Sequence, residues 1–189
     1  MKLISLALTS AALAIVAAAA SAQTSQPAEK GAAAPAPAQE PAKIRRTETI
    51  VDDNWTVTCA ETDKGGAKKQ CSAALRIAQA DKSGAQHVVF TWVLGHQDTK
   101  LMSAISVPTG VQIPAGLELK IGDKEARKLG YSVCVPDHCE ALLPLEDTIV
   151  KSLSAAPTTE ITIRAVNGSD LKFSVNMKGF AQALADITK

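Results

Sequence analysis

The sequence predicts a mainly β protein, either an antiparallel β-sandwich or a partly closed barrel, with two short α-helices, one of them near the C-terminus. Short stretches of alternating apolar and polar residues recur from residue 49 onward, with turn-forming residues between them. Helical spacing of apolar residues appears only after residue 146. Aromatic residues make up 3% of the chain, so we expect an aliphatic core with Trp55 and Trp92 as its large anchors.

Residues 1–22 have the composition of a secretory signal peptide, with cleavage expected before Gln23. Lys2 precedes an apolar run that ends in Ala20-Ser21-Ala22. An uncleaved membrane anchor is the alternative, because the run approaches the ~18 residues of a membrane span, although alanine is a weak spanning residue. No cysteine precedes Cys59, which excludes a lipoprotein anchor at the cleavage site. We expect no transmembrane span in the mature chain.

Residues 23–46 are predicted to form a disordered tether, because Ala, Pro, Gln and Glu dominate them without apolar periodicity. Lys43, Arg45 and Arg46 form a short basic cluster at its end, either a solvated linker end or a contact for anionic lipid. Residues 47–189 have the size of a single domain. Without residues 1–22 the chain has equal numbers of acidic and basic residues, so we expect no nucleic-acid partner.

The first predicted strand covers residues 49–59, and its C-terminal half alternates. The residues on its apolar face are Trp55, Val57 and Cys59. A solvated turn is expected at residues 63–69, which contain Gly65-Gly66. The chain then returns as an antiparallel strand, because apolar residues alternate from Cys71 to Ile77.

Residues 86–94 form the most hydrophobic predicted strand, after a turn at residues 81–85. One face is expected to carry Val88, Phe90, Trp92 and Leu94, and the other Val89 and Val93. Because both faces are apolar, we place this strand in the centre of a sheet. A further strand at residues 101–107 ends at Pro108 and Gly110.

Pro114 and Gly116 interrupt the chain before a predicted strand at residues 117–121. Gly122-Asp123 suits a two-residue hairpin turn, from which residues 124–129 return. The cysteine-containing hairpin at residues 131–140 follows.

Residues 147–155 are predicted to form a short amphipathic helix. A strand at residues 159–166 leads to Asn167-Gly168, the strongest hairpin signal in the chain. The returning strand carries Leu171, Phe173 and Val175. A closing helix is expected at residues 179–187, with Phe180, Leu184 and Ile187 on one stripe.

Four cysteines in an exported chain predict two disulfides, and four cysteines allow three connectivities. We favour sequential pairing. Cys59 with Cys71 joins the two ends of a predicted hairpin, and Cys134 with Cys139 closes a small ring around a proline turn. The second ring would present four residues as a rigid binding tip: Val135, Pro136, Asp137 and His138.

A thiol-redox or metal-dependent enzyme centred on Cys134, His138 and Cys139 is the alternative function. Thiol-exchange sites normally use a Cys-x-x-Cys pair at a helix N-terminus, whereas these cysteines lie in a strand-turn-strand context. A zinc site would need a fourth ligand and would compete with oxidation of the thiols. We therefore assign no catalytic residue, no metal ligand and no cofactor.

The remaining polar residues have ordinary structural explanations. His87 and His96 are separated by an odd number of positions, so they face opposite sides of an unbroken strand. The acidic residues considered lie in turns or at helix starts, where they cap and solubilise: Asp52, Asp53, Asp123, Glu146 and Asp147. No serine follows a nucleophile-elbow pattern, and no glycine-rich loop opens a helix to hold phosphate.

An ordered succession of motifs resembles the invasion-associated locus B family over nearly all of the folded domain. The motifs are 54–59 (Asn-Trp-Thr-Val-Thr-Cys) with Cys71, 105–108 (Ile-Ser-Val-Pro) with Gly110-Val111, 131–140, and 177–180 (Met-Lys-Gly-Phe) before an Ala/Leu helix. The resemblance implies an exported β-rich protein of Gram-negative bacteria that is periplasmic, outer-membrane-associated or secreted. Some members are linked to host-cell invasion, and the family brings no established enzymatic chemistry.

We therefore expect a non-enzymatic, disulfide-stapled protein that binds a protein or an envelope component. A small-ligand carrier is a third possibility, whose mark would be an apolar cavity open to solvent. The identity of the partner and the oligomeric state do not follow from the sequence.

Overall fold

Two antiparallel sheets and two short helices make up the fold in a computed structural model, which describes residues 43–62 and 69–189. The predicted signal peptide, most of the predicted tether and the Gly65-Gly66 turn lie outside the described residues. Within the part of the chain that the structure describes, no helix is long and apolar enough to cross a membrane.

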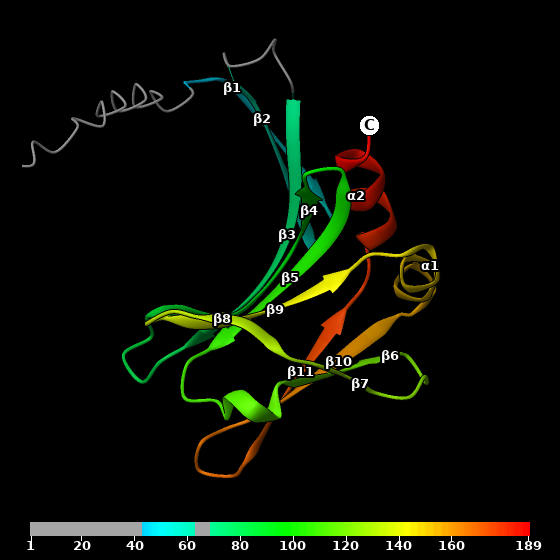
Figure 1. The fold of residues 1–189 in the computed structure, drawn as a ribbon. Helices are drawn as coiled ribbons and strands as arrows, with labels where there is room; N and C mark the ends of the chain where they lie inside the picture. Colours follow the sequence, from blue (N-terminus) through cyan, green and yellow to red (C-terminus); the bar gives the residue numbers. More distant parts are fainter. Residues whose placement is uncertain (1–42, 63–68) are drawn as a thin grey trace, which may run out of the picture. The chain divides into compact units, whose positions relative to one another are not determined.

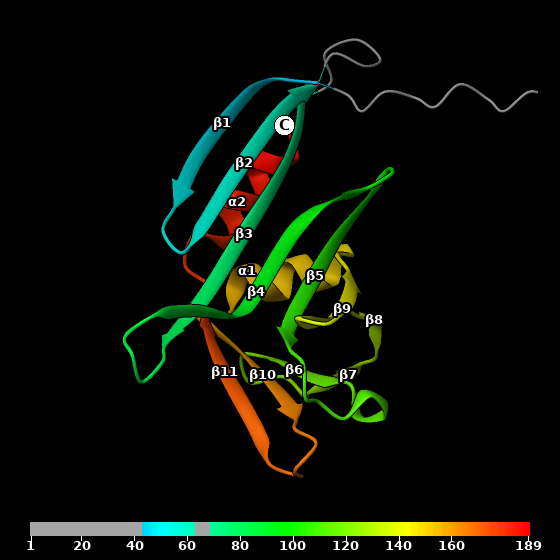
Figure 2. The ribbon, with the colours of Figure 1, turned by 90° about the vertical axis from the view of Figure 1, so that its left-hand side faces the viewer.

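The larger sheet has seven strands among the described residues, and all neighbouring strands are antiparallel. In spatial order they are β1 (Ile44–Asp52), β2 (Trp55–Thr62), β3 (Lys69–Ala80), β4 (Gln86–Gln97), β5 (Lys100–Pro108), β9 (His138–Pro144) and β8 (Tyr131–Cys134). Strand β4 occupies the middle, as its two apolar faces predict. Figure 2 shows β1 at one edge of this sheet.

The smaller sheet has four antiparallel strands in the described part. In spatial order they are β11 (Asp170–Asn176), β10 (Thr158–Arg164), β6 (Leu117–Ile121) and β7 (Arg127–Leu129). A short 3-10 helix, η1 (Ile113–Ala115), precedes β6. Neither sheet closes on itself, so the fold agrees with the sandwich alternative and not with the barrel.

The core lies on one face of the larger sheet. Both α1 (Asp147–Ala155) and α2 (Phe180–Ile187) are on this side, and the smaller sheet packs there too (Figure 1). Trp55 makes edge-to-face contacts with Trp92 and Phe180, at centroid distances of 6.1 and 5.6 Å. Phe90 stacks on Phe173 of the smaller sheet at 5.2 Å. Both tryptophans are fully buried, which confirms them as core anchors.

The predicted strand at residues 49–59 is wrong as a single strand. The structure has a hairpin there: β1 ends at Asp52, β2 begins at Trp55, and β1 starts at Ile44, before the expected domain start at residue 47. The turn contains neither glycine nor proline, because Asp53 itself adopts the left-handed region at φ 52°. Aspartate tolerates this conformation better than most residues, so the turn gave no strong signal.

Val88 was expected on the buried face of β4 but is 57% exposed. The register shifts between Ile77, which pairs with Phe90, and Ala78, which pairs with Val88. Val89 is therefore the extra residue of a β-bulge, and the alternation of faces is broken at this point. The alternating pattern of the sequence does not reveal this inserted residue, because Val88 and Val89 are the same residue type.

Two hairpin loops are longer than predicted. Strand β7 covers only Arg127–Leu129, so the connection after β6 spans residues 122–126 and not the Gly122-Asp123 pair alone. At the other hairpin, Ala165 donates its N–H to Ser169 O and accepts from Gly168 N–H, which gives a three-residue loop. Gly168 has φ 84°, as in a turn followed by a glycine bulge.

Both helices lie where the sequence places them. The bounds of α1 match the predicted residues 147–155. Helix α2 buries Phe180, Ala183 and Ile187, whereas Leu184 of the predicted stripe is only partly buried.

Candidate functional site

The disulfides join the cysteines in the predicted sequential order. Cys59 bonds to Cys71 across the directly paired strands β2 and β3. Cys134 bonds to Cys139 across β8 and β9, where the two residues are also direct partners. All four cysteines are therefore oxidised, and no free thiol is present at the candidate redox centre.

The hairpin tip of residues 135–138 is a tight corner. Val135 donates its backbone N–H to the carbonyl oxygen of His138 at 2.9 Å, so Pro136 and Asp137 alone form the corner. The disulfide closes the hairpin one residue further in, and the fixed φ of proline restricts the corner itself. His138 Nδ1 lies 3.0 Å from Asp137 Oδ1. The disulfide and the backbone hydrogen bond thus constrain the backbone of the four predicted tip residues.

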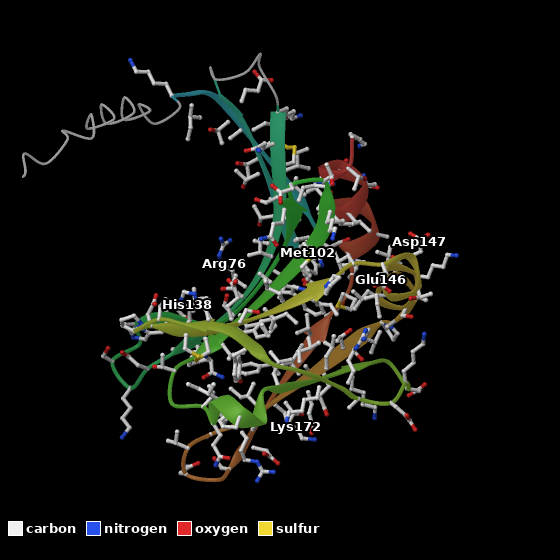
Figure 3. The ribbon with its side chains drawn as sticks, viewed as in Figure 1. Arg76, Met102, His138, Glu146, Asp147 and Lys172 are labelled. Atoms are coloured by element: carbon white, nitrogen blue, oxygen red, sulfur yellow. A yellow bond between two sulfur atoms is a disulfide. The ribbon has the colours of Figure 1, made fainter. Side chains whose placement is uncertain are left out.

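The tip forms one side of a groove in the larger sheet. His138 pairs directly with Pro108 of β5, which places the corner beside that strand. The groove has a volume of about 380 Å³. Its lining residues are Arg76, Val88, Val89, Phe90, Thr91, Ser106, Val107, Pro108, Asp137 and His138. Arg76 and His138 both lie on the side of the sheet away from the helices (Figure 3).

Three of the lining residues form one row across the sheet. Arg76 of β3 pairs with Thr91 of β4, and Thr91 pairs with Ser106 of β5. Directly paired residues on adjacent strands project from the same face, roughly 5 Å apart. An arginine, a threonine and a serine therefore follow one another across the groove, and Glu140 of β9 continues the row beyond Ser106.

The positive charge of Arg76 is not neutralised within the described residues. Its side chain is exposed and forms no ion pair or hydrogen bond there, whereas the carboxylate of Asp137 already contacts His138. The groove thus offers five N–H donors from one guanidinium to a bound group.

An apolar row runs beside the polar one. Ala74 pairs with Val93, Val93 with Ala104, and Ala104 with Leu142, so four small or aliphatic side chains cross the same face of the sheet. All four are half-buried. Together the two rows form an outer face with an apolar strip and a polar groove next to it.

The predicted surface histidines do not join the groove. His87 lies 2.9 Å from Asp81 Oδ2, and its ring is exposed. The bonds from Ser83, His87 and Ala85 hold the pKa of Asp81 at about 2. His96 is exposed at the other end of β4. Neither histidine shares a site with the other or with His138.

One pair of carboxyl groups escaped the sequence analysis. Burial raises the pKa of Asp52, and the neighbouring Asp186 raises it further. Asp52 Oδ2 is buried without a hydrogen-bond partner among the described residues. The contact with Lys189 lowers the pKa of Asp186. Asp52 ends β1 and Asp186 lies in α2, so only the folded chain brings them together. No sequence signal links these positions.

The described residues form no cluster of metal-binding side chains. Within them, no three His, Cys, Asp or Glu side chains are grouped so as to hold an ion. The predicted site contributes only His138, because both cysteines beside it are in a disulfide.

Comparisons with known proteins agree on one family. The family model "Invasion associated locus B (IalB) protein" matches residues 55–188. Two curated proteins of Brucella abortus strains, each called an invasion protein B homolog, are 26% identical over 132 residues, which is 69% of this chain and 73% of the relatives. The crystal structure of invasion associated protein B from Bartonella henselae superposes with a TM-score of 0.61 at 18% identity, over 75% of this chain and 95% of that one, and supports the fold.

Proposed function

Because this chain belongs to the invasion-associated locus B family, we propose that it is an exported, non-enzymatic protein that binds a protein or another envelope component. The observation that carries the proposal is the disulfide-closed tip of residues 135–138 beside the groove on the outer face of the larger sheet. The curated relatives and the Bartonella henselae protein are named for invasion, so a contribution to contact with host cells is part of the proposal.

The tip is suited to binding because its conformation is fixed before a partner arrives. Ordering a flexible loop at an interface costs free energy, and a covalently closed corner avoids most of that cost. Val135 is 37% exposed and the Asp137 side chain 82% exposed. The tip therefore presents an apolar and a charged group to solvent from a rigid base.

The outer face next to the tip supplies further contact area. The row from Ala74 to Leu142 is apolar and half-buried, and its small side chains allow close approach of another surface. Protein interfaces combine an apolar core with a polar rim. Arginine is more frequent in interfaces than on the rest of the protein surface. Arg76 at the border of the apolar row fits that arrangement.

The proposal is tested by capturing envelope components with the full chain as bait. We expect a Pro136→Ala/His138→Ala variant to recover less of the specific partner than wild type. Val166→Ala is the matched control, because Val166 is 68% exposed at the tip of the other hairpin. Equal recovery by wild type and by the tip variant, or turnover in an unbiased substrate screen, would contradict the proposal.

The thiol-redox alternative has one supporting observation. Cys134 is exposed at the sheet edge, whereas Cys139 is 3% exposed. An external thiolate would therefore reach the Cys134 sulfur first, and access controls the rate of exchange. Peptide mapping under non-reducing conditions decides the matter: free thiols at these positions in protein isolated from cells favour redox chemistry, and a complete disulfide favours the staple.

A further inference from the structure

We infer that the groove receives a single carboxylate of the partner, from an Asp or Glu side chain, which binds Arg76, Thr91 and Ser106. This inference rests on the proposed function and names the chemistry that the groove recognises. It adds a specific charged contact to a surface that otherwise offers shape and apolar area.

The donors required for a carboxylate are already in place. Arg76 stands at one end of the row and contacts no acidic side chain in the parts of the chain that are described. A guanidinium binds a carboxylate through two parallel N–H···O bonds. Thr91 and Ser106, the next two members of the row, carry hydroxyl groups that the described structure leaves without a hydrogen-bond partner.

The surrounding charges disfavour a dianion more strongly than a monoanion. Glu140 follows Ser106 in the same row, and Asp137 lies on the wall of the groove. A dianionic phosphate would experience repulsion from both carboxylates, whereas a carboxylate brings half that charge and a planar shape that matches the guanidinium.

The rest of the lining favours a side chain of a polypeptide. Val88, Val89 and Pro108 give the groove apolar sides, and Val88 is 57% exposed. A volume of about 380 Å³ accommodates one acidic side chain with parts of its neighbours. An acidic residue flanked by apolar residues therefore matches both the charge and the walls of the groove.

The test uses the ¹⁵N-labelled full chain and an N-acetylated, C-amidated Val-Glu-Val peptide. We expect the peptide to shift the amide resonances of Thr91 and Ser106, and the matched Val-Gln-Val peptide to bind about tenfold more weakly. Arg76→Gln is expected to lose the preference for the Glu peptide. Arg127→Gln retains it, because Arg127 is an exposed arginine on β7 of the smaller sheet.

Three results would overturn the inference. They are equal binding of the two peptides, an Arg76→Gln variant that binds the Glu peptide like wild type, and inorganic phosphate that binds at Arg76 as tightly as the Glu peptide. The envelope capture experiment separates this inference from the proposed function. If Arg76→Gln still captures the partner while the tip variant does not, the carboxylate contact is refuted and the binding role of the tip stands.

Discussion

The backbone carbonyl oxygen of Asp52 lies 2.0 Å from the position that a Cβ atom on Gly179 would occupy. The β1–β2 turn therefore packs directly on the residue that precedes α2. Asn54 reinforces the contact by donating its side-chain amide to Asn176 O at 3.3 Å. Only glycine fits here, because the site combines a left-handed φ of 87° with a backbone neighbour that cannot move aside.

Gly179→Ala is predicted to destabilise the protein by about 3 kcal/mol or more, since strain at a left-handed position adds to the clash with Asp52. Gly168→Ala is the matched control. Gly168 has a φ of 84° and no atom within 4 Å of the added Cβ, so its cost should be about 1 kcal/mol. Urea denaturation measures the free energy of unfolding of both variants. Equal losses of stability would show that the contact between Gly179 and Asp52 is unimportant.

Asp52→Asn is predicted to raise the melting temperature at neutral pH. Because the folded protein raises the pKa of Asp52, this carboxyl contributes most to stability below its ordinary pKa of 3.8, and the contribution is lost as pH rises through the raised pKa. An asparagine keeps a donor toward Asp186 without the charge. Melting curves across the acidic range should show the gain shrinking toward pH 3.8. A variant less stable than wild type at neutral pH contradicts this account.

Ser103→Ala is predicted to cost about 2 kcal/mol, because it leaves the indole N–H of Trp92 without an acceptor in the core. Thr159→Val is predicted to change the free energy of unfolding in the opposite direction. The Thr159 hydroxyl is buried and already lacks a partner, so its removal should stabilise by about 1 kcal/mol. Chemical denaturation of the two variants compares them directly, and a stabilising Ser103→Ala would contradict the hydrogen-bond assignment.

The two disulfides are predicted to differ in their contributions to stability and to partner binding. Their sequence separations are 12 for Cys59–Cys71 and 5 for Cys134–Cys139. Chain entropy then gives about 3 kcal/mol for the first and about 2 kcal/mol for the second. Replacing Cys134 and Cys139 by alanine should cost less stability than replacing the other pair. It should nevertheless reduce partner capture more, because the Cys134–Cys139 disulfide closes the tip that we propose to bind the partner. The reverse order would remove the tip from the binding surface.

Local features of this fold could be predicted from the sequence because neighbouring residues determine them. The spacing of Ile149, Val150 and Leu153 predicts α1, and Asn167-Gly168 predicts the hairpin between β10 and β11. The bulge at Val89 could not be predicted, since residues 88 and 89 are both valine and only the pairing with β3 makes Val89 the extra residue.

Only part of the candidate site could be predicted, because some of its residues come together through local sequence and others only through the pairing of strands. His138 and its hairpin follow from the cysteine spacing, which is a local signal. Arg76 enters the groove only through the register of β3, β4 and β5, which pairs it with Thr91 and places Ser106 next in the row. The Asp52–Asp186 pair likewise depends on packing between distant segments, so the sequence indicated only a turn residue at Asp52 and no link to Asp186.

Photocrosslinking at the tip tests the central claim most directly. A photoreactive amino acid replaces Val135 in the full chain, and Val166 at the other hairpin tip serves as the control position. The account predicts a discrete crosslinked partner from position 135 in cells or envelope fractions, and none of that product from position 166. The same product from position 166, or no product from position 135 while the protein still captures its partner, would contradict the claim that the disulfide-closed tip is the binding surface.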